Sequence, residues 1–142
     1  MSRDAGIVVS GESVPWFEVA DGIEMKVLHL GDDLPTWTVL IRFQAGERLP
    51  HHIHLAPAEL YIIEGSGTHR ATGDFSTGDH VFEHTGARHQ PTTFHEETVL
   101  LMVSYGPVAV LNETGELDWI MDVDFFKQQL GPQATAAVTA SA

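Results

Sequence analysis

The chain has 142 residues, which is enough for one domain with a buried core, and its composition of 43% hydrophobic and 19% charged residues is ordinary for a globular protein. With 7 basic and 20 acidic residues the formal net charge is −13, which argues against a nucleic-acid partner. The lack of Cys excludes disulfides, thiolate metal sites and cysteine nucleophiles. The 9 His residues are the unusual feature, so we look for a functional site among them.

The distribution of apolar residues along the chain predicts a protein without a membrane partner. Residues 1–6 carry one Arg and are followed by no apolar run, which predicts no signal peptide. The longest apolar stretch, residues 99–111, is interrupted at Ser104, Tyr105, Gly106 and Pro107 and is too short to span a bilayer. We therefore expect a cytoplasmic protein.

Short strands separated by turn residues dominate the chain. In residues 36–43, Trp37, Val39, Ile41 and Phe43 alternate with residues of the opposite face, which is the period of a β-strand. The same pattern predicts strands at residues 60–63, 67–72, 80–83 and 98–105. Strands at this spacing indicate an all-β sandwich or barrel.

The end of the chain has a different character. Residues 122–130 show the only helical pattern, and it is short. Residues 131–142 contain no charged residue and include Gly, Pro, Ser and Thr, so we expect a flexible tail there. The sequence thus predicts one domain over residues 1–130, with at most a short C-terminal helix.

Three histidines have the spacing of a metal site. His52 and His54 are two residues apart in an extended stretch, so their side chains point to the same face and can share a metal. His89 is a third candidate, if the fold brings it beside the first two. The remaining histidines are expected to lie mostly at solvated strand positions; they include His29, His69, His80 and His95.

These spacings resemble the two motifs of the cupin superfamily. The positions that match are Gly46, His52 and His54 in the first motif, and Gly78, Gly86 and His89 in the second. Two positions of the second motif depart, because His84 stands in place of Pro and Thr93 in place of Asn. The resemblance implies a double-stranded β-helix, which is a jelly-roll barrel with the metal site inside.

The carboxylate ligand of the first motif is missing from its usual position. Counting back from Gly65, that position falls on Ala58, and Glu59 is its neighbour. A shift of one residue on a strand turns a side chain to the other face, so Glu59 can be a fourth ligand only if the strand bulges at Pro57. We therefore expect a site of three His residues.

A three-His site favours particular metals and substrates. Three neutral ligands leave a divalent ion its full double charge, which favours an anionic, chelating substrate and leaves room for O2. Imidazole ligands suit Fe(II), and they also suit Zn(II) and Ni(II).

Within the cupins, the chain most resembles the acetylacetone-cleaving and 2,4'-dihydroxyacetophenone-type dioxygenases. The segments that carry this resemblance are residues 52–59, 83–89 and 105–116, within a region of about residues 23–120. It implies a dioxygenase that cleaves a C–C bond of a small 1,3-diketone or hydroxyaryl ketone bound as its enolate. It further implies that His52, His54 and His89 bind Fe(II), that Glu83 holds a ligand or water by a hydrogen bond, and that Arg70 and Thr92 are polar pocket residues.

Other functions remain open at this stage, because the cupin fold hosts many. One alternative is a zinc-binding cupin without redox chemistry, such as the sensory half of certain anti-sigma factors or another binding module. A second is an isomerase or cyclase that uses the metal as a Lewis acid. We expect a homo-oligomer, because open jelly rolls leave edge strands to be covered. The family resemblance implies a homodimer or homotetramer.

Overall fold

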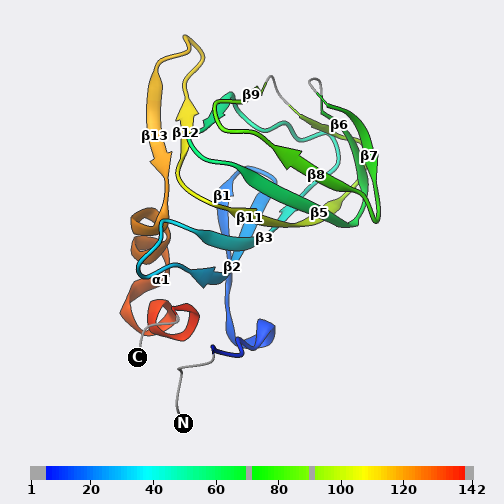
Figure 1. The fold of residues 1–142 in the computed structure, drawn as a ribbon. Helices are drawn as coiled ribbons and strands as arrows, with labels where there is room; N and C mark the ends of the chain where they lie inside the picture. Colours follow the sequence, from blue (N-terminus) through cyan, green and yellow to red (C-terminus); the bar gives the residue numbers. More distant parts are fainter. Residues whose placement is uncertain (1–5, 70–71, 90–91, 140–142) are drawn as a thin grey trace.

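The chain forms short antiparallel strands and ends in a helix (Figure 1). The computed structural model describes residues 6–69, 72–89 and 92–139, with only the backbone described at His89. A 3-10 helix, η1, spans Gly11–Ser13. The strands are β1 (Trp16–Ala20), β2 (Ile23–Leu30), β3 (Trp37–Phe43), β4 (His52–His54), β5 (Ala58–Glu64), β6 (Ser66–His69), β7 (Gly73–Ser76), β8 (His80–Glu83), β9 (Arg88–His89), β10 (Thr93–Phe94), β11 (Thr98–Ser104), β12 (Val108–Leu111) and β13 (Leu117–Met121). The helix α1 spans Val123–Val138.

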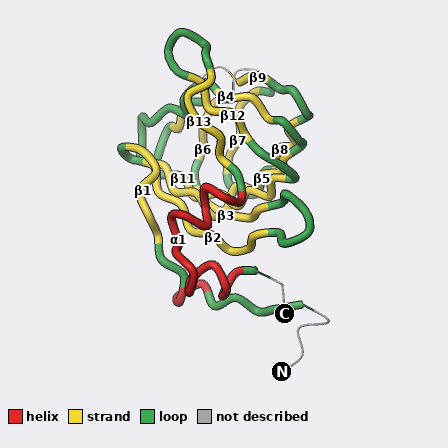
Figure 2. The backbone as a smooth tube through the Cα atoms, turned by 90° about the vertical axis from the view of Figure 1, so that its left-hand side faces the viewer, coloured by secondary structure: helices red, strands yellow, loops and turns green. Residues whose placement is uncertain are grey.

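The strands are arranged in three sheets that enclose a common interior (Figure 2). The six-stranded sheet has the order β1-β2-β3-β11-β5-β8, the four-stranded sheet β13-β12-β4-β9, and the three-stranded sheet β10-β6-β7. Strands that are far apart in sequence are neighbours, as β3 with β11 and β4 with β12. This topology confirms the expected all-β jelly roll with a helix at its C-terminal end.

The alternation seen in the sequence sets which side chains enter the barrel. Trp37, Val39, Ile41 and Phe43 of β3 are all buried, while the residues between them are partly exposed. The β11 strand alternates in the same way and pairs with β3 along its full length. The strand predicted at residues 36–43 is therefore confirmed. As β3, it forms one side of the barrel interior.

The helix differs from the expected tail. Asp122 caps α1 by accepting a hydrogen bond from the Phe125 amide at 2.9 Å, as the helical pattern from residue 122 suggests. The helix is interrupted at Gly131, where φ is 78° and ψ is 172°, and it resumes at Pro132, a residue that suits a first helical turn. Residues 132–138 are thus helical, and the expectation of a flexible tail is wrong for them.

Burial explains why this terminal segment is ordered. Phe126 and Val138 are fully buried, and Thr139 bridges to Leu30 of β2. Figure 1 shows the helix packed beside β2 and β13. Gly-Pro in an uncharged stretch suggested a tail, whereas here it marks a bend between two helical pieces. Within the described ranges, no helix has the length and apolar character needed to cross a bilayer.

The outward face of β5 carries a small polar cluster. Glu59 accepts a hydrogen bond from the Tyr105 hydroxyl, and its other oxygen lies 3.1 Å from His80 Nε2. The Tyr105 hydrogen bond, followed by the His80 contact, lowers the pKa of Glu59 below its usual value. The same hydrogen bond raises the pKa of Tyr105.

The terminal helix yields a first prediction. Val138→Ala should lower the free energy of unfolding by about 1–3 kcal/mol, because it removes buried methyl groups and leaves a cavity. Urea unfolding followed by circular dichroism measures this change. Val8→Ala is the matched control, since Val8 is 97% exposed, and it should have little effect. Equal stability of Val138→Ala and the parent chain would mean that residues 132–138 do not pack as described.

The polar cluster yields a second prediction. Because the folded-state pKa of Glu59 is lowered, its stabilising contact is present above the ordinary carboxyl pKa and is lost as the pH falls through the folded value. Tyr105→Phe removes the largest cause, so the pKa of Glu59 should rise and this acid-side loss should shrink. An NMR titration of the Glu59 carboxyl measures the shift, with Tyr61→Phe as the control. An unchanged titration in Tyr105→Phe would contradict the assigned cause.

Candidate metal centre

The backbone brings the two histidine segments together. Strands β4 and β9 are antiparallel, and His52 lies directly opposite His89. Next to this pair, the Gly86 amide donates to the His54 carbonyl at 2.6 Å, and the His54 amide donates to the Ala87 carbonyl at 3.3 Å. Gly86 has a φ of 79°, a left-handed conformation that glycine adopts without strain. Opposed residues on paired strands have Cα atoms roughly 4.5–5.5 Å apart, so the backbone of His89 lies where a third ligand is expected.

The side chains of His52 and His54 face one interior, as their spacing predicts. Their ring centroids are 5.0 Å apart, and both rings line the same cavities. His52 Nδ1 lies 2.9 Å from the Pro50 carbonyl oxygen. A carbonyl can only accept, so Nδ1 carries the proton and Nε2 of His52 carries the lone pair that a metal requires. The side chain of His89 lies outside the described part of the chain.

Glu83 of β8 enters the interior and contacts two imidazoles. Its Oε2 lies 2.5 Å from His54 Nε2, and its Oε1 lies 3.3 Å from His69 Nε2. All three side chains are at least nine-tenths buried. Glu83 therefore lies against one of the predicted ligands, and not at a solvent-facing strand end.

His69 of β6 is a site residue that the sequence analysis missed, because it was expected at a solvated position. The Thr72 amide donates to His69 Nδ1 at 3.2 Å. The proton must then be on Nε2, which faces the Glu83 carboxylate. The sequence does contain a signal for the inward position of His69. It lies two residues from Gly67 on the same strand, and both residues face inward.

The structure settles which residue of β5 faces inward. Ala58 is fully buried and lies opposite Glu83 on β8. Glu59 points to the outer face, where it contacts His80 and Tyr105. The pairing of β5 with β8 is regular from Ala58 onward, so there is no bulge that would turn Glu59 inward. Glu59 is thereby excluded as a fourth ligand.

The other two candidate residues have different outcomes. Thr92 is buried and lines the same cavity as His52, His54 and Glu83, where a polar pocket residue is expected. Arg70 lies outside the described residues, so its expected place in the pocket stays a prediction.

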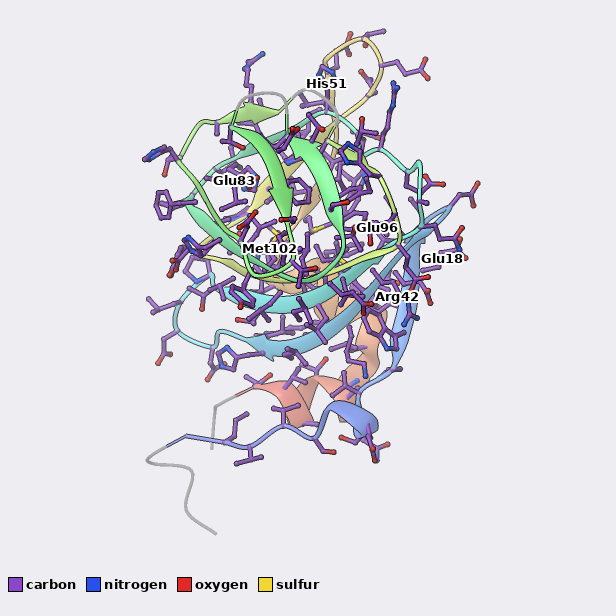
Figure 3. The ribbon with its side chains drawn as sticks, turned by 90° about the vertical axis from the view of Figure 1, so that its right-hand side faces the viewer. Glu18, Arg42, His51, Glu83, Glu96 and Met102 are labelled. Atoms are coloured by element: carbon purple, nitrogen blue, oxygen red, sulfur yellow. The ribbon has the colours of Figure 1, made fainter. Side chains whose placement is uncertain are left out.

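Two cavities meet at the histidines. A small cavity of about 50 Å³ contains Glu83, His69 and Thr92. A larger one of about 200 Å³ has mostly apolar walls, including Trp119, Val108 and Met121. The side chains that border both are Ile41, Leu49, His52, His54 and Met102. In Figure 3, Glu83 and Met102 lie within the barrel and His51 lies at its rim.

Inward-facing apolar side chains of β3 and β11 line the two cavities. Trp37, Ile41, Phe43 and Met102 border the cavities, as their inward positions suggest. Phe82 does not, because it lies on the outer face of β8 and is exposed. Its place on the strand, one residue before the inward-facing Glu83, explains the difference.

The donor types at this site fit a divalent transition metal. Imidazole nitrogens together with a carboxylate oxygen suit Fe(II), Zn(II) and Ni(II). Among the side chains that the structure describes, no three His, Asp or Glu residues lie together in a group that could hold a metal ion. Glu83 contacts His54 and His69, and the ring of His52 lies beside that of His54. The side chain of the expected third histidine, His89, is not described.

Known structures share this fold. An acetylacetone dioxygenase from Acinetobacter johnsonii is 21% identical, with a TM-score of 0.77 over 97% of this chain and 95% of that chain. A Methylibium petroleiphilum protein provisionally described as an acetylacetone dioxygenase is 22% identical, with a TM-score of 0.81 over 93% and 99%. The Rhodobacter sphaeroides complex of SigE with the anti-sigma ChrR matches at 18% identity and a TM-score of 0.58, over 66% of this chain and 50% of that chain.

Family assignment comes from the sequence itself. A comparison with curated proteins finds no match. The family described as the ChrR cupin-like domain matches residues 4–109, which is more than half of the chain. That range contains both histidine segments, the inward-facing Ala58 and the buried Glu83. The chain therefore belongs to the ChrR cupin-like domain family of the cupin superfamily.

Proposed function

We propose that this protein is an Fe(II)-dependent dioxygenase that cleaves a C–C bond of a small 1,3-diketone or hydroxyaryl ketone bound as its enolate. One observation carries the proposal. The two histidines of β4 lie at the boundary between a small cavity that contains the buried Glu83 carboxylate and a larger, mostly apolar one, so a metal held there faces both. The smaller cavity supplies a carboxylate and the larger one has room for an organic ligand.

The larger cavity supports a small, mostly apolar substrate. Its volume of about 200 Å³ lies below the roughly 300–1,000 Å³ of pockets that hold drug-sized ligands. Asp118 is the one charged residue among its lining side chains, all of which belong to the described part of the chain. A substrate bound there has few polar groups besides those that reach the metal.

The chain's own residues supply binding, orientation and exclusion of water. His52 and His54 hold the metal, with the expected help of His89, and the Pro50 carbonyl orients the His52 ring for this role. Ile41, Leu49 and Met102 border both cavities beside the histidines, and their apolar side chains would exclude water from a metal held there. A bound Fe(II) ion supplies reactivity toward O2 and the positive charge that favours an enolate.

Coverage of the related structures also supports this function. The two structures described as acetylacetone dioxygenases align with nearly the whole of this chain and nearly the whole of their own. The match to the ChrR complex covers only half of that chain.

A second candidate function is a zinc-binding sensor without redox chemistry. The membership of the ChrR cupin-like domain family favours it, because one structure that shares the fold contains the anti-sigma ChrR. Zinc accepts three histidines and keeps an open position. The two functions differ in metal identity and in consumption of O2.

The ligand set yields a prediction of metal loss. His52→Ala, His54→Ala and His89→Ala should each lose bound metal, because each removes an imidazole ligand. His95→Ala is the control, since that exposed ring bonds to Thr68 Oγ1 at 2.9 Å on the outside of the barrel. Metal content of the purified variants measures the effect. If His95→Ala loses as much metal as His89→Ala does, the third ligand is wrongly assigned.

The proposed activity yields a prediction of oxygen uptake. The protein should be loaded with Fe(II) without oxygen, then supplied with O2 and a panel of small 1,3-diketones and hydroxyacetophenones. Substrate-dependent O2 uptake is expected, and it should vanish in His54→Ala. A protein that binds zinc tightly, refuses iron and consumes no O2 would instead support the sensor.

A further inference from the structure

The carboxylate that is missing from β5 has a counterpart on the neighbouring strand. Ala58 occupies the position at which the first cupin motif carries its carboxylate, and Glu83 of β8 is its direct cross-strand partner. Opposed residues on paired strands send their side chains to the same face, with Cβ atoms about 4.5–5.5 Å apart. Because Ala58 has only a methyl group, Glu83 enters the space that a carboxylate at position 58 would fill.

Glu83 reaches the ligand atom of a histidine. Its Oε2 lies 2.5 Å from His54 Nε2, whereas two donor atoms bound to one ion at about 2.1 Å each lie roughly 3.0–3.4 Å apart, depending on the angle at the ion. A small separation of the two side chains lets both hold the same ion. We propose that Glu83 is a direct metal ligand and replaces, from β8, the carboxylate that β5 lacks.

His52 and His69 have opposite tautomers and therefore different roles at the site. His52 bonds through Nδ1 and keeps its lone pair on Nε2, as a metal ligand does. His69 has the opposite tautomer, because Thr72 donates to its Nδ1 and its protonated Nε2 faces Glu83 Oε1. His69 is therefore a positioning residue that holds one oxygen of Glu83 and turns the other toward His54.

Electrostatics favour this arrangement. Glu83 is 6% exposed within a largely apolar interior, where an ionised carboxylate is costly unless a positive charge compensates it. A divalent ion provides that charge and retains one net positive charge, which a singly charged enolate would neutralise. The inference rests on the metal-binding part of the proposed function and not on the dioxygenase reaction.

The test is a carboxylate exchange in the 142-residue chain. Zn²⁺ affinity is measured by chelator competition, and the Co²⁺ complex is examined by visible absorption. Glu83→Gln should weaken Zn²⁺ binding by more than about 100-fold, beyond the 10–100-fold typical of losing an outer partner. The Co²⁺ spectrum should also change, because an anionic ligand is lost. The double variant Ala58→Glu/Glu83→Ala should recover most of the affinity, because it restores a carboxylate from β5.

Controls separate ligation from general effects. Glu59→Gln removes the adjacent carboxylate on the outer face of β5 and should leave both readouts unchanged. His69→Gln should weaken Zn²⁺ binding less than Glu83→Gln does, and should keep the Co²⁺ spectrum of the parent chain. Circular dichroism verifies that each variant is folded. If the double variant does not fold, the Co²⁺ spectrum of Glu83→Gln decides the question.

The outcomes distinguish this inference from the proposed function. Zn²⁺ affinity within tenfold of the parent in Glu83→Gln would overturn direct ligation, and so would weaker binding with an unchanged Co²⁺ spectrum. A parent chain that binds neither ion would overturn both proposals. Metal binding that depends on Glu83, in a protein without O2 uptake, would support the ligand assignment and refute the dioxygenase.

Discussion

The pairing of β4 with β9 is the interaction on which the candidate site depends. It places His52 opposite His89, and the hydrogen bonds of Gly86 and Ala87 to His54 hold the second segment against the first. Side chains from two distant parts of the chain can meet only if this register is kept, because a slip of one residue would turn every side chain to the opposite face. The rest of the jelly roll therefore keeps the short pairing of β4 with β9 in register.

Local periodicity explains what could be predicted from the sequence. A period of two was enough to place His52 with His54, to bury Trp37 with Phe43, and to separate Ala58 from Glu59. It could not reveal which strand lies beside which, so the contact of Glu83 with His54 needed the three-dimensional structure. The helical residues 132–138 were missed for a similar reason, because their order comes from burial of Val138 against the barrel and not from local pattern.

His69 shows how a long-range contact changes the meaning of a residue. On sequence evidence an isolated histidine on a short strand is expected at the surface. In the fold it is buried, receives a hydrogen bond from Thr72, and faces a buried carboxylate. A buried polar group requires such partners, and these two are supplied by a turn and by a strand of another sheet. The buried group of His54, His69 and Glu83 is thus a product of three sheets meeting, and no single motif encodes it.

The identity of the metal decides between the two candidate functions on physical grounds. With Glu83 added to three histidines, a zinc ion would have four protein ligands, which completes the tetrahedral coordination typical of structural zinc sites. An Fe(II) ion with the same four ligands is not saturated, because iron sites of this kind keep open positions for substrate or oxygen. The same side chains would therefore form a closed centre with zinc and an open one with iron. A sensor needs only the first, and a dioxygenase requires the second, next to the apolar cavity that His52 and His54 border.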